Sequence, residues 1–409
     1  MNKSMYSFRR TNVKKQNIKF SSRLYAILAL FLPILMQYKF PILNFSVSTI
    51  LICFVGIIIL PLIAISFSYK DVKQIIPLSI FFLFAAFKSP SANAVLFVFI
   101  VVHLFFISLG GVELSFIRKG VELISSIASI LVIFQTVFYY LTGIHVPLVI
   151  SDLCIDSARS TYNSLISTGI SGDIYRPSAF FLEPAHFSEY CIFGFVSSLF
   201  SKKKNFFKIF LIAIGIVCTT SGIGIALVVL STFAYLLLHF LGTKNYLGLI
   251  KYLLALLFIF LIAYQFPFVK NAVDRVFVGE KNGGMNAFQG RLFWWDVYFG
   301  SRKITDFIWG FGGQQLPDNY FTAFMVYIYA YGIVGFLLYS IGLLVLFFKN
   351  NYFSKLLIII IFGLTLFANI TNAYYLIFSM AIIITLGRGK EDFSIVTIPN
   401  ANDCILLNE

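Results

Sequence analysis

The chain has 409 residues, of which 59% are hydrophobic and only 12% are charged, and its mean hydropathy is +0.90. This much apolar surface exceeds what the core of a soluble domain can bury, so we expect lipid to surround most of the chain. The apolar runs are continuous rather than alternating, which argues against a β-barrel.

The N-terminal tail, residues 1–23, is strongly basic and contains no acidic residue. Its basic residues are Lys3, Arg9, Arg10, Lys14, Lys15, Lys19 and Arg23. A basic block beside the first apolar run marks the cytoplasmic side of a membrane. Topology therefore accounts for the net charge of +14, and we expect no nucleic-acid partner.

Twelve apolar runs follow, and because a spanning helix needs about 20 apolar residues we interpret each as a transmembrane helix. They lie near residues 24–38, 47–67, 75–87, 92–109, 121–141, 187–200, 206–218, 223–240, 249–264, 321–348, 356–367 and 374–386. Lys and Arg gather in alternate connections, which predicts an even number of spans with both chain ends in the cytoplasm. We predict an all-α polytopic membrane protein, a single membrane domain over residues 1–409 that ends in a second cytoplasmic tail at 388–409.

Two connections, 142–186 and 266–320, are much longer than the others, and both fall on the outer side of this topology. Long loops are uncommon and usually functional, so we expect the chemistry here and predict short interfacial helices within both loops. The five cysteines show neither a disulfide framework nor the spacing of metal ligands. We therefore expect no metal site built on cysteines.

Ionisable groups gather in the first long loop where the next span begins, at Arg176, Glu183, His186 and Glu189. At helical spacing His186 and Glu189 share one face, and Pro184 suits a first helical turn. A carboxylate and an imidazole at a membrane surface suit the removal of a proton from a sugar hydroxyl, and an arginine suits a phosphate. In the structural alternative, Glu183 caps the helix, His186 lies among lipid headgroups and Glu189 pairs with a neighbour.

The second long loop carries an aromatic segment at residues 290–298. On a helix its Arg291 shares one face with three aromatic residues, Trp294, Trp295 and Tyr298, which predicts a helix lying in the membrane interface. A guanidinium at that depth is placed to meet a lipid-linked pyrophosphate. The structural alternative is an aromatic anchor with a snorkelling arginine.

A glycine-rich turn over residues 309–320 runs into the following span and contains Asn319 and Tyr320. Flexible glycines beside these polar side chains suit a sugar pocket, and the alternative is a loop that only turns back into the membrane. Residues 220–224 predict a tight turn between two spans, which we interpret as packing.

Taken together, these features resemble the O-antigen polymerase (Wzy-type) family of bacterial inner-membrane polysaccharide polymerases, which is related to the O-antigen ligases. The resemblance covers most of the chain as architecture: about twelve spans, cytoplasmic ends and two large periplasmic loops. At the level of residues it rests on Arg-Pro-Ser followed by Glu-Pro-Ala-His within 176–189, on 220–222, on Gly290-Arg291 with the tryptophans, and on 309–312, 319–320 and 331–332.

The resemblance implies a reaction and its partners. Family members transfer a growing glycan on undecaprenyl pyrophosphate to a single lipid-linked repeat unit and release undecaprenyl pyrophosphate. The product is O-antigen or a related surface polysaccharide of lipopolysaccharide biosynthesis. The reaction needs no nucleotide sugar, cofactor or metal, and its partners are the lipid-linked glycans, the bilayer and, in some systems, a chain-length regulator protein.

The resemblance also implies roles for residues of this sequence. Arg176 and Arg291 are expected to engage the pyrophosphate, and Glu183 or His186 is expected to be the base for the acceptor hydroxyl. Weaker phosphate candidates are Arg159, Arg275 and Arg302. The remaining candidates for substrate binding are Glu189, Asn319 and Tyr320.

Three alternatives stay open. O-antigen ligases transfer the finished glycan to the lipid A core and carry a histidine in the second long periplasmic loop, whereas 266–320 contains none here. Flippases and other transporters of polysaccharide units have short loops and charges within the bundle, whereas the spans here hold few, such as Glu122, Glu189 and the lone imidazole of His103. Other lipid-carrier transferases place an acid in the first outer loop, which 39–44 lacks.

Overall fold

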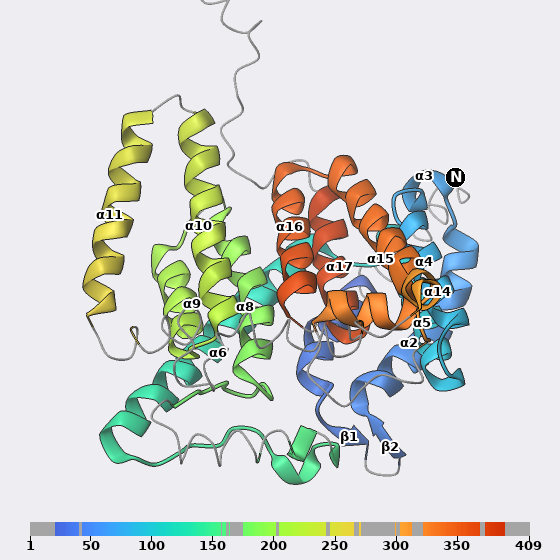
Figure 1. Cartoon of the computed structure of the whole chain (residues 1–409), viewed down its shortest axis with the longest axis horizontal. Helices are drawn as coiled ribbons and strands as arrows, with labels where there is room; N and C mark the ends of the chain where they lie inside the picture. Colours follow the sequence, from blue (N-terminus) through green and yellow to red (C-terminus); the bar gives the residue numbers. More distant parts are fainter. Residues whose placement is uncertain are drawn as a thin grey trace, which may run out of the picture.

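The computed structural model describes residues 21–40, 43–156, 158–160, 163, 175–201, 204–242, 246–265, 270, 299, 303–312, 322–368 and 373–388. This part of the chain is mostly helical, and the helices pack against one another (Figure 1). The first helix runs over Ser21–Leu35. The longer helices after it are α2 (Val47–Ser66), α4 (Ile76–Phe87), α5 (Ser91–Ser108), α6 (Leu114–Thr142), α8 (Pro184–Leu199), α9 (Phe206–Cys218), α10 (Gly222–Gly242), α11 (Tyr246–Tyr264), α15 (Ala323–Lys349), α16 (Tyr352–Phe367) and α17 (Ala373–Arg388).

The connections contain several short elements. They are α3 (Tyr69–Val72), the 3-10 helix η1 (Ser151–Leu153), α14 (Ile304–Trp309) and the strands β1 (Lys39–Phe40) and β2 (Leu43–Ser46). The two strands pair antiparallel, so the connection after the first helix is a small hairpin rather than a plain loop. Both long loops contain a short helix, η1 in the first and α14 in the second, whereas the interfacial position predicted for such helices stays a prediction.

The helices have the length and composition of a membrane-embedded protein. Within the described residues, α2, α6, α10 and α15 are long and apolar enough to cross a bilayer, and several further apolar helices are shorter. The predicted all-α membrane class is therefore confirmed. Every predicted span falls on a helix. Because many of these helices are short, the number of twelve crossings stays a prediction.

The surface of α6 shows how the sequence suits lipid. Its exposed stripe consists of large apolar side chains: Leu123, Ile127, Ile130, Phe134 and Val137. Its buried stripe is rich in small and polar ones: Val121, Ser125, Ala128, Ser129, Val132 and Gln135. Small residues inside and large apolar residues outside are typical of helices that pack within a membrane.

Serine side chains pack directly against glycines of neighbouring helices among α6, α8, α9 and α10. The facing pairs are Ser125 with Gly194, Ser129 with Gly215 and Ser188 with Gly224. A side chain at any of the three glycines would overlap the serine opposite it. Close approach of helix backbones through small residues is the main source of packing where no hydrophobic effect operates. These pairs therefore fix how α6, α8, α9 and α10 sit against one another.

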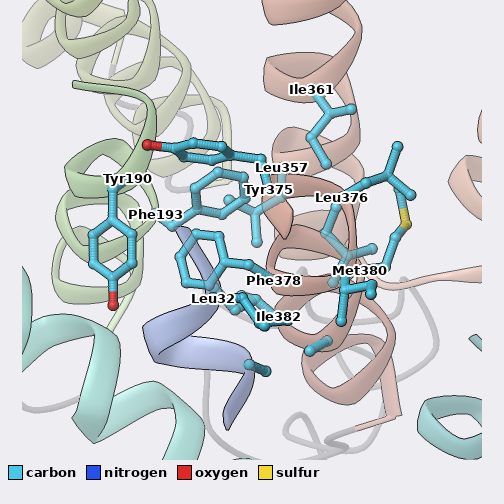
Figure 2. Packing of buried hydrophobic residues seen from close by; sticks show 14 of the residues in the cluster. Leu32, Tyr190, Phe193, Leu357, Ile361, Tyr375, Leu376, Phe378, Met380 and Ile382 are labelled. Atoms are coloured by element: carbon cyan, nitrogen blue, oxygen red, sulfur yellow. The ribbon is translucent and has the colours of Figure 1, made fainter. Parts of the chain in front are cut away.

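An aromatic core joins α8, α16, α17 and the first helix (Figure 2). Tyr190 of α8 stacks on Phe378 of α17, with ring centroids 4.5 Å apart, and Phe193 meets the same ring edge-on at 5.3 Å. Leu32 and Leu357 are fully buried in the same cluster. This core holds α8, whose first turn carries the predicted site residues.

The helix α15 bends sharply at Gly332, where φ is 69° and ψ is −177°. The bend frees backbone groups that an intact helix would pair, and residues that follow α14 supply partners. The amide of Phe311 donates to the carbonyl of Tyr329, and the amide of Gly312 donates to that of Ala330, both at 2.8 Å. In Figure 1 α14 lies beside α15 at this point. Residues 311–312 thus supply backbone partners to the bent helix, a role that neither predicted alternative for the glycine-rich turn included.

His103 is fully engaged in packing. Its Nδ1 lies 2.6 Å from the hydroxyl of Tyr25, and its Nε2 lies 3.0 Å from the carbonyl of Ile52. Since a carbonyl only accepts, Nε2 carries the proton and Nδ1 accepts from the tyrosine. Both ring nitrogens of His103 have hydrogen-bond partners within the bundle. The His103 ring therefore gives no support to the alternative of a transporter.

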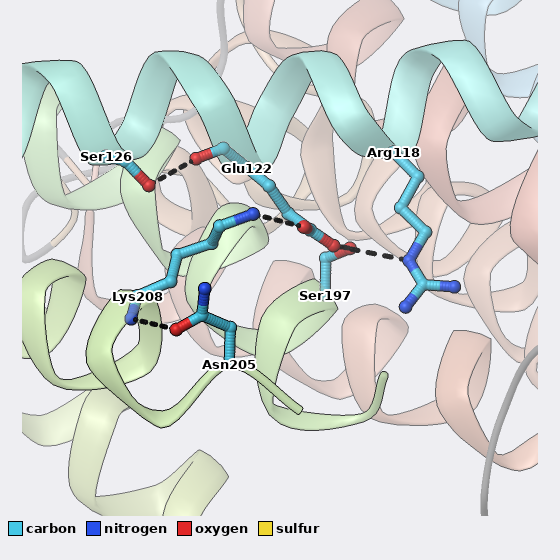
Figure 3. Close-up of polar contacts among 6 residues, drawn as sticks. All are labelled: Arg118, Glu122, Ser126, Ser197, Asn205 and Lys208. Carbon is cyan, nitrogen blue, oxygen red and sulfur yellow. Dashed lines mark hydrogen bonds and ion pairs between the residues drawn. The ribbon is translucent and has the colours of Figure 1, made fainter. Parts of the chain in front are cut away.

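A carboxylate joins three helices at the end of the bundle where the first helix and α6 begin, which we call the charged end. Glu122 of α6 accepts from Arg118 Nε at 3.3 Å, from Lys208 Nζ of α9 at 3.1 Å and from Ser197 Oγ of α8 at 2.9 Å (Figure 3). The Glu122 side chain is only 12% exposed. α6 begins at Leu114, before the predicted position 121, and its early turns include the Arg118–Glu122 ion pair.

The Glu122 cluster gives a stability prediction. Glu122→Gln removes the charge that two cations share, and we expect the free energy of unfolding to fall by about 1 to 3 kcal/mol. The matched control is Glu113→Gln, which breaks a pair with Arg23, whose side chain is 52% exposed. Solvent screens that exposed pair, so its loss should change stability far less than the loss of the Glu122 charge. Thermal melts of both variants in detergent test this, and equal losses would contradict the joining role of Glu122.

Candidate functional site

The predicted residues of the first long loop gather at the other end of the bundle, which we call the site end. Here the first helix and α6 end, and α2, α8, α10 and α17 begin. The Tyr375 hydroxyl of α17 donates to the His186 carbonyl of α8 at 2.8 Å. The Ser188 hydroxyl lies 3.3 Å from the Thr219 hydroxyl, in the tight turn before α10. Side chains from several elements are therefore held together around the first turn of α8.

Glu183 occupies the N-cap position of α8, and Pro184 follows it at the first helical position. Proline suits this position because its missing amide hydrogen would be unpaired there in any case. The Glu183 side chain makes no capping hydrogen bond. The alternative in which this carboxylate caps the helix with a hydrogen bond is therefore wrong. The first long loop ends here, three residues earlier than predicted.

His186 and Glu189 lie three residues apart in α8, so they share one face of the helix, as predicted. His186 is partly buried, and its ring centroid is 5.9 Å from that of Tyr375. Glu189 is only 2% exposed. Burial of a carboxylate in an apolar bundle is expensive and usually marks a function.

Arg176 is partly buried and follows a residue that is anchored on α6. Tyr175 stacks on Tyr139 in the last turns of α6, with ring centroids 4.3 Å apart, and meets the His145 ring edge-on at 4.7 Å. Burial lowers the pKa of His145, which favours a neutral ring near pH 7. The aromatic cluster therefore anchors the backbone next to Arg176 at the end of α6, and a neutral His145 adds no second positive charge there.

Two glutamines at the site end were missed by the sequence analysis. Gln37 follows the first helix and Gln135 lies in α6; they are 2% and 4% exposed. Both hold the backbone of the segment that runs from Arg176 to Glu183. A signal was present in the sequence, because an amide side chain is costly to bury in apolar surroundings unless it is used.

Some buried polar atoms at the site end have no hydrogen-bond partner. Among the described residues, the buried imidazole and amide atoms in this state are Nδ1 of His186, Nε2 of His145 and Oε1 of Gln37. His186 and His145 lie beside Tyr375 and Tyr175, and Gln37 holds the segment between them. Buried polar groups normally find partners, so each of these three atoms is open to a hydrogen bond from a ligand or a water molecule.

Arg159, a weaker phosphate candidate, is used locally. Its Nε donates to the Ser151 carbonyl at 3.0 Å and its Nη2 donates to the Asp152 carbonyl at 2.7 Å. The guanidinium thus closes the turn formed by η1. This contact favours a structural role for Arg159.

The remaining predicted site residues lie outside the described residues. They are Arg275, Arg291, Arg302, Asn319 and Tyr320. The predicted interfacial face of Trp294, Trp295 and Tyr298 lies outside them as well. The meeting of Arg291 with Arg176 therefore stays a prediction.

In the part of the chain that the structure describes, no three or more His, Cys, Asp or Glu side chains gather in a way that could hold a metal ion. No protein-family model, no curated protein and no solved structure matches the chain.

Proposed function

We propose that this chain is a membrane glycosyltransferase, a polymerase that joins oligosaccharide repeat units carried on undecaprenyl pyrophosphate. One observation carries the proposal: the Glu183 carboxylate, unused in capping, begins α8 within one turn of His186, at the end of an apolar bundle. Arg176 and the buried Glu189 belong to the same end. A base and a cation at a membrane boundary are what transfer from a lipid-linked diphosphate requires.

The reaction assigned to this site is a displacement at a sugar carbon. An acceptor hydroxyl oxygen attacks the anomeric carbon of the donor glycan and loses its proton to Glu183 or His186. The bond from that carbon to the pyrophosphate oxygen breaks, and undecaprenyl pyrophosphate leaves with the electron pair. Arg176, joined in the proposal by Arg291, stabilises the negative charge that develops on the leaving group. One such preorganised contact is worth about 3 to 4 kcal/mol of the barrier.

A bundle in the membrane also brings the two substrates together. Both are carried by lipid, so they diffuse in one plane and reach the site with their pyrophosphates at the same depth. Orientation of this kind lowers the entropic part of the barrier. Soluble transferases obtain the same effect by binding substrates from water, which lipid-carried glycans do not enter.

The proposal assigns the site end to the outer surface of a bacterial inner membrane and both termini to the cytoplasm. It is supported by charge: basic side chains are abundant in the connections of the charged end and in the N-terminal tail. Cytoplasmic connections carry such an excess of Lys and Arg. The glycan products are O-antigen or a related surface polysaccharide.

Reconstitution tests the proposed function. The purified chain in vesicles, supplied with undecaprenyl-pyrophosphate-linked repeat units, is expected to form a ladder of longer lipid-linked glycans and to release undecaprenyl pyrophosphate. Transfer of preformed glycan only to added lipid A core would identify a ligase instead. Movement of the lipid-linked unit across the bilayer without a ladder would identify a flippase. The absence of all three products would overturn the proposal.

A further inference from the structure

We propose that Gln37 and Gln135 are positioning residues that clamp the backbone between Arg176 and Glu183, and so set the distance between the phosphate-binding cation and the base. The catalytic part of this inference rests on the proposed function. Its mechanical part concerns only the fold. The two parts are therefore tested by separate measurements.

The two glutamines hold neighbouring peptide groups from different elements. The amide of Ala179 donates to Gln135 Oε1 at 2.9 Å, and Gln37 Nε2 donates to the carbonyl of Phe180 at 2.8 Å. Gln135 Nε2 also donates to the carbonyl of Val146 at 2.7 Å. These donors and acceptors fix the orientation of both amides, because a carbonyl only accepts and a backbone amide only donates.

The clamped backbone is strained at Ala179, where φ is 51°. A left-handed conformation is unfavourable for residues with a Cβ, and it persists only where the surroundings impose it. The amide that donates this hydrogen bond to Gln135 Oε1 belongs to the strained residue itself. Gln135 is therefore placed to stabilise a left-handed backbone conformation that is unfavourable for alanine.

The clamp also connects this segment to the rest of the site end. The backbone carbonyl of Gln37 accepts from the amide of Ile155 at 2.9 Å, while Gln135 reaches Val146. The clamp therefore ties three stretches of the first long loop to the ends of two helices. Arg176 and Glu183 lie on either side of the clamped peptide, so a shift there moves both.

The function of the clamp explains an otherwise costly arrangement. Both side chains are almost fully buried, and Oε1 of Gln37 makes no hydrogen bond. An apolar residue would avoid the burial of an unsatisfied acceptor. Ser178 already closes a local turn with Phe181, so chain reversal alone does not require the glutamines. What the glutamines add is a fixed register between the turn and the helices.

Hydrogen exchange tests the mechanical part. In Gln135→Leu and in Gln37→Leu, the amides of residues 176–183 are expected to exchange at least about tenfold faster than in the wild type, because the clamp no longer limits their opening. The matched control is Gln265→Leu, which replaces an exposed glutamine outside the site. Unchanged exchange at 176–183 in both clamp variants would overturn the inference.

Steady-state kinetics in vesicles tests the catalytic part. For Gln135→Leu we expect kcat to fall by about tenfold to a hundredfold with little change in KM, since positioning groups act on the transition state. Gln135→Glu keeps an acceptor for the Ala179 amide but loses the donor to Val146, so it should retain more kcat than Gln135→Leu and less than the wild type. Adding Ala179→Gly to Gln135→Leu should recover part of the loss, because glycine adopts positive φ without strain.

The possible results separate the two claims. Faster exchange with unchanged kcat in Gln135→Leu would remove the positioning role and leave the proposed function intact. A wild-type protein that forms no ladder would remove the catalytic part together with the proposed function, while the exchange data would still decide the clamp. If Gln135→Leu does not fold, Gln135→Glu and Gln37→Leu carry the test, and a loss in Gln135→Glu equal to that in Gln37→Leu would contradict the assigned role of the Ala179 contact.

Discussion

Arg176→Ala is expected to lower ladder formation by about a hundredfold to a thousandfold, the loss seen when one preorganised charge-stabilising contact is removed. The reason is that the guanidinium has to neutralise charge that appears only as the pyrophosphate leaves. The loss should therefore fall on kcat rather than on KM. Arg176→Lys should recover only part of the activity, because an ammonium lacks the planar pair of donors that matches a phosphate.

The control for this prediction is Arg159→Ala. Arg159 belongs to the same loop, but its guanidinium is bound to the backbone of Ser151 and Asp152. Its removal should leave kcat within about threefold of the wild type, a difference of less than 1 kcal/mol in the barrier. Equal losses in Arg176→Ala and Arg159→Ala would show that the loop tolerates no charge change, and the specific role of Arg176 would be lost.

The helices were predictable from the sequence because a continuous apolar run has few alternatives to a helix in lipid. Continuous apolar residues need lipid or a core, and the backbone in lipid has to pair its own polar groups, which a helix does. The first turn of α8 was also predictable, since Pro184 and the spacing of His186 and Glu189 are local features. The helix boundaries were less predictable from the sequence. α6 starts earlier than expected, since its first turns carry charged residues that a search for apolar runs leaves out; Glu122 pairs there with Arg118 and with Lys208 of α9.

The clamp and the bend were not predictable for a different reason. Gln37 and Gln135 are far apart in the sequence, and their partners lie in a third segment around Ala179. The bend at Gly332 depends on residues 310–312, which approach it from another element. Sequence patterns report local periodicity, whereas these contacts depend on which segments the fold brings together. The polar side chains and glycines signal that something is required, without naming the partner.

The bend in α15 gives the second large expected effect. Gly332→Ala and Gly310→Ala should each lower the free energy of unfolding by more than about 4 kcal/mol, in the range reserved for severe backbone conflicts. Both glycines have positive φ, of 69° and 72°. An added Cβ at Gly332 would overlap the backbone of Ile308, and one at Gly310 would overlap the backbone of Tyr331 and Gly332. Backbone atoms cannot rotate away as a flexible side chain can. The bend of α15 and the segment at α14 would therefore have to move apart.

The aromatic packing around the bend opposes a straightening of α15 that would relieve the overlap in these variants. Phe81 of α4 sits in the corner of the bend, with ring centroids 5.2 Å from Tyr327 before it and 5.3 Å from Tyr339 after it. Tyr339 also lies 3.1 Å from the Thr365 hydroxyl of α16. Straightening α15 would break these contacts on both sides of Gly332. The bend is therefore a fixed feature of the fold rather than a hinge.

The matched control is Gly363→Ala in α16, where an added Cβ meets no atom within 4 Å. Alanine is the better helix former there, so the variant should be unchanged or more stable by up to about 1 kcal/mol. Thermal melts and yields of monodisperse protein would compare the three variants. If Gly332→Ala melted within a few degrees of Gly363→Ala, the bend would be a flexible joint. The segment over residues 310–312 would then be a passive cover, and the second long loop would not be anchored at the bend.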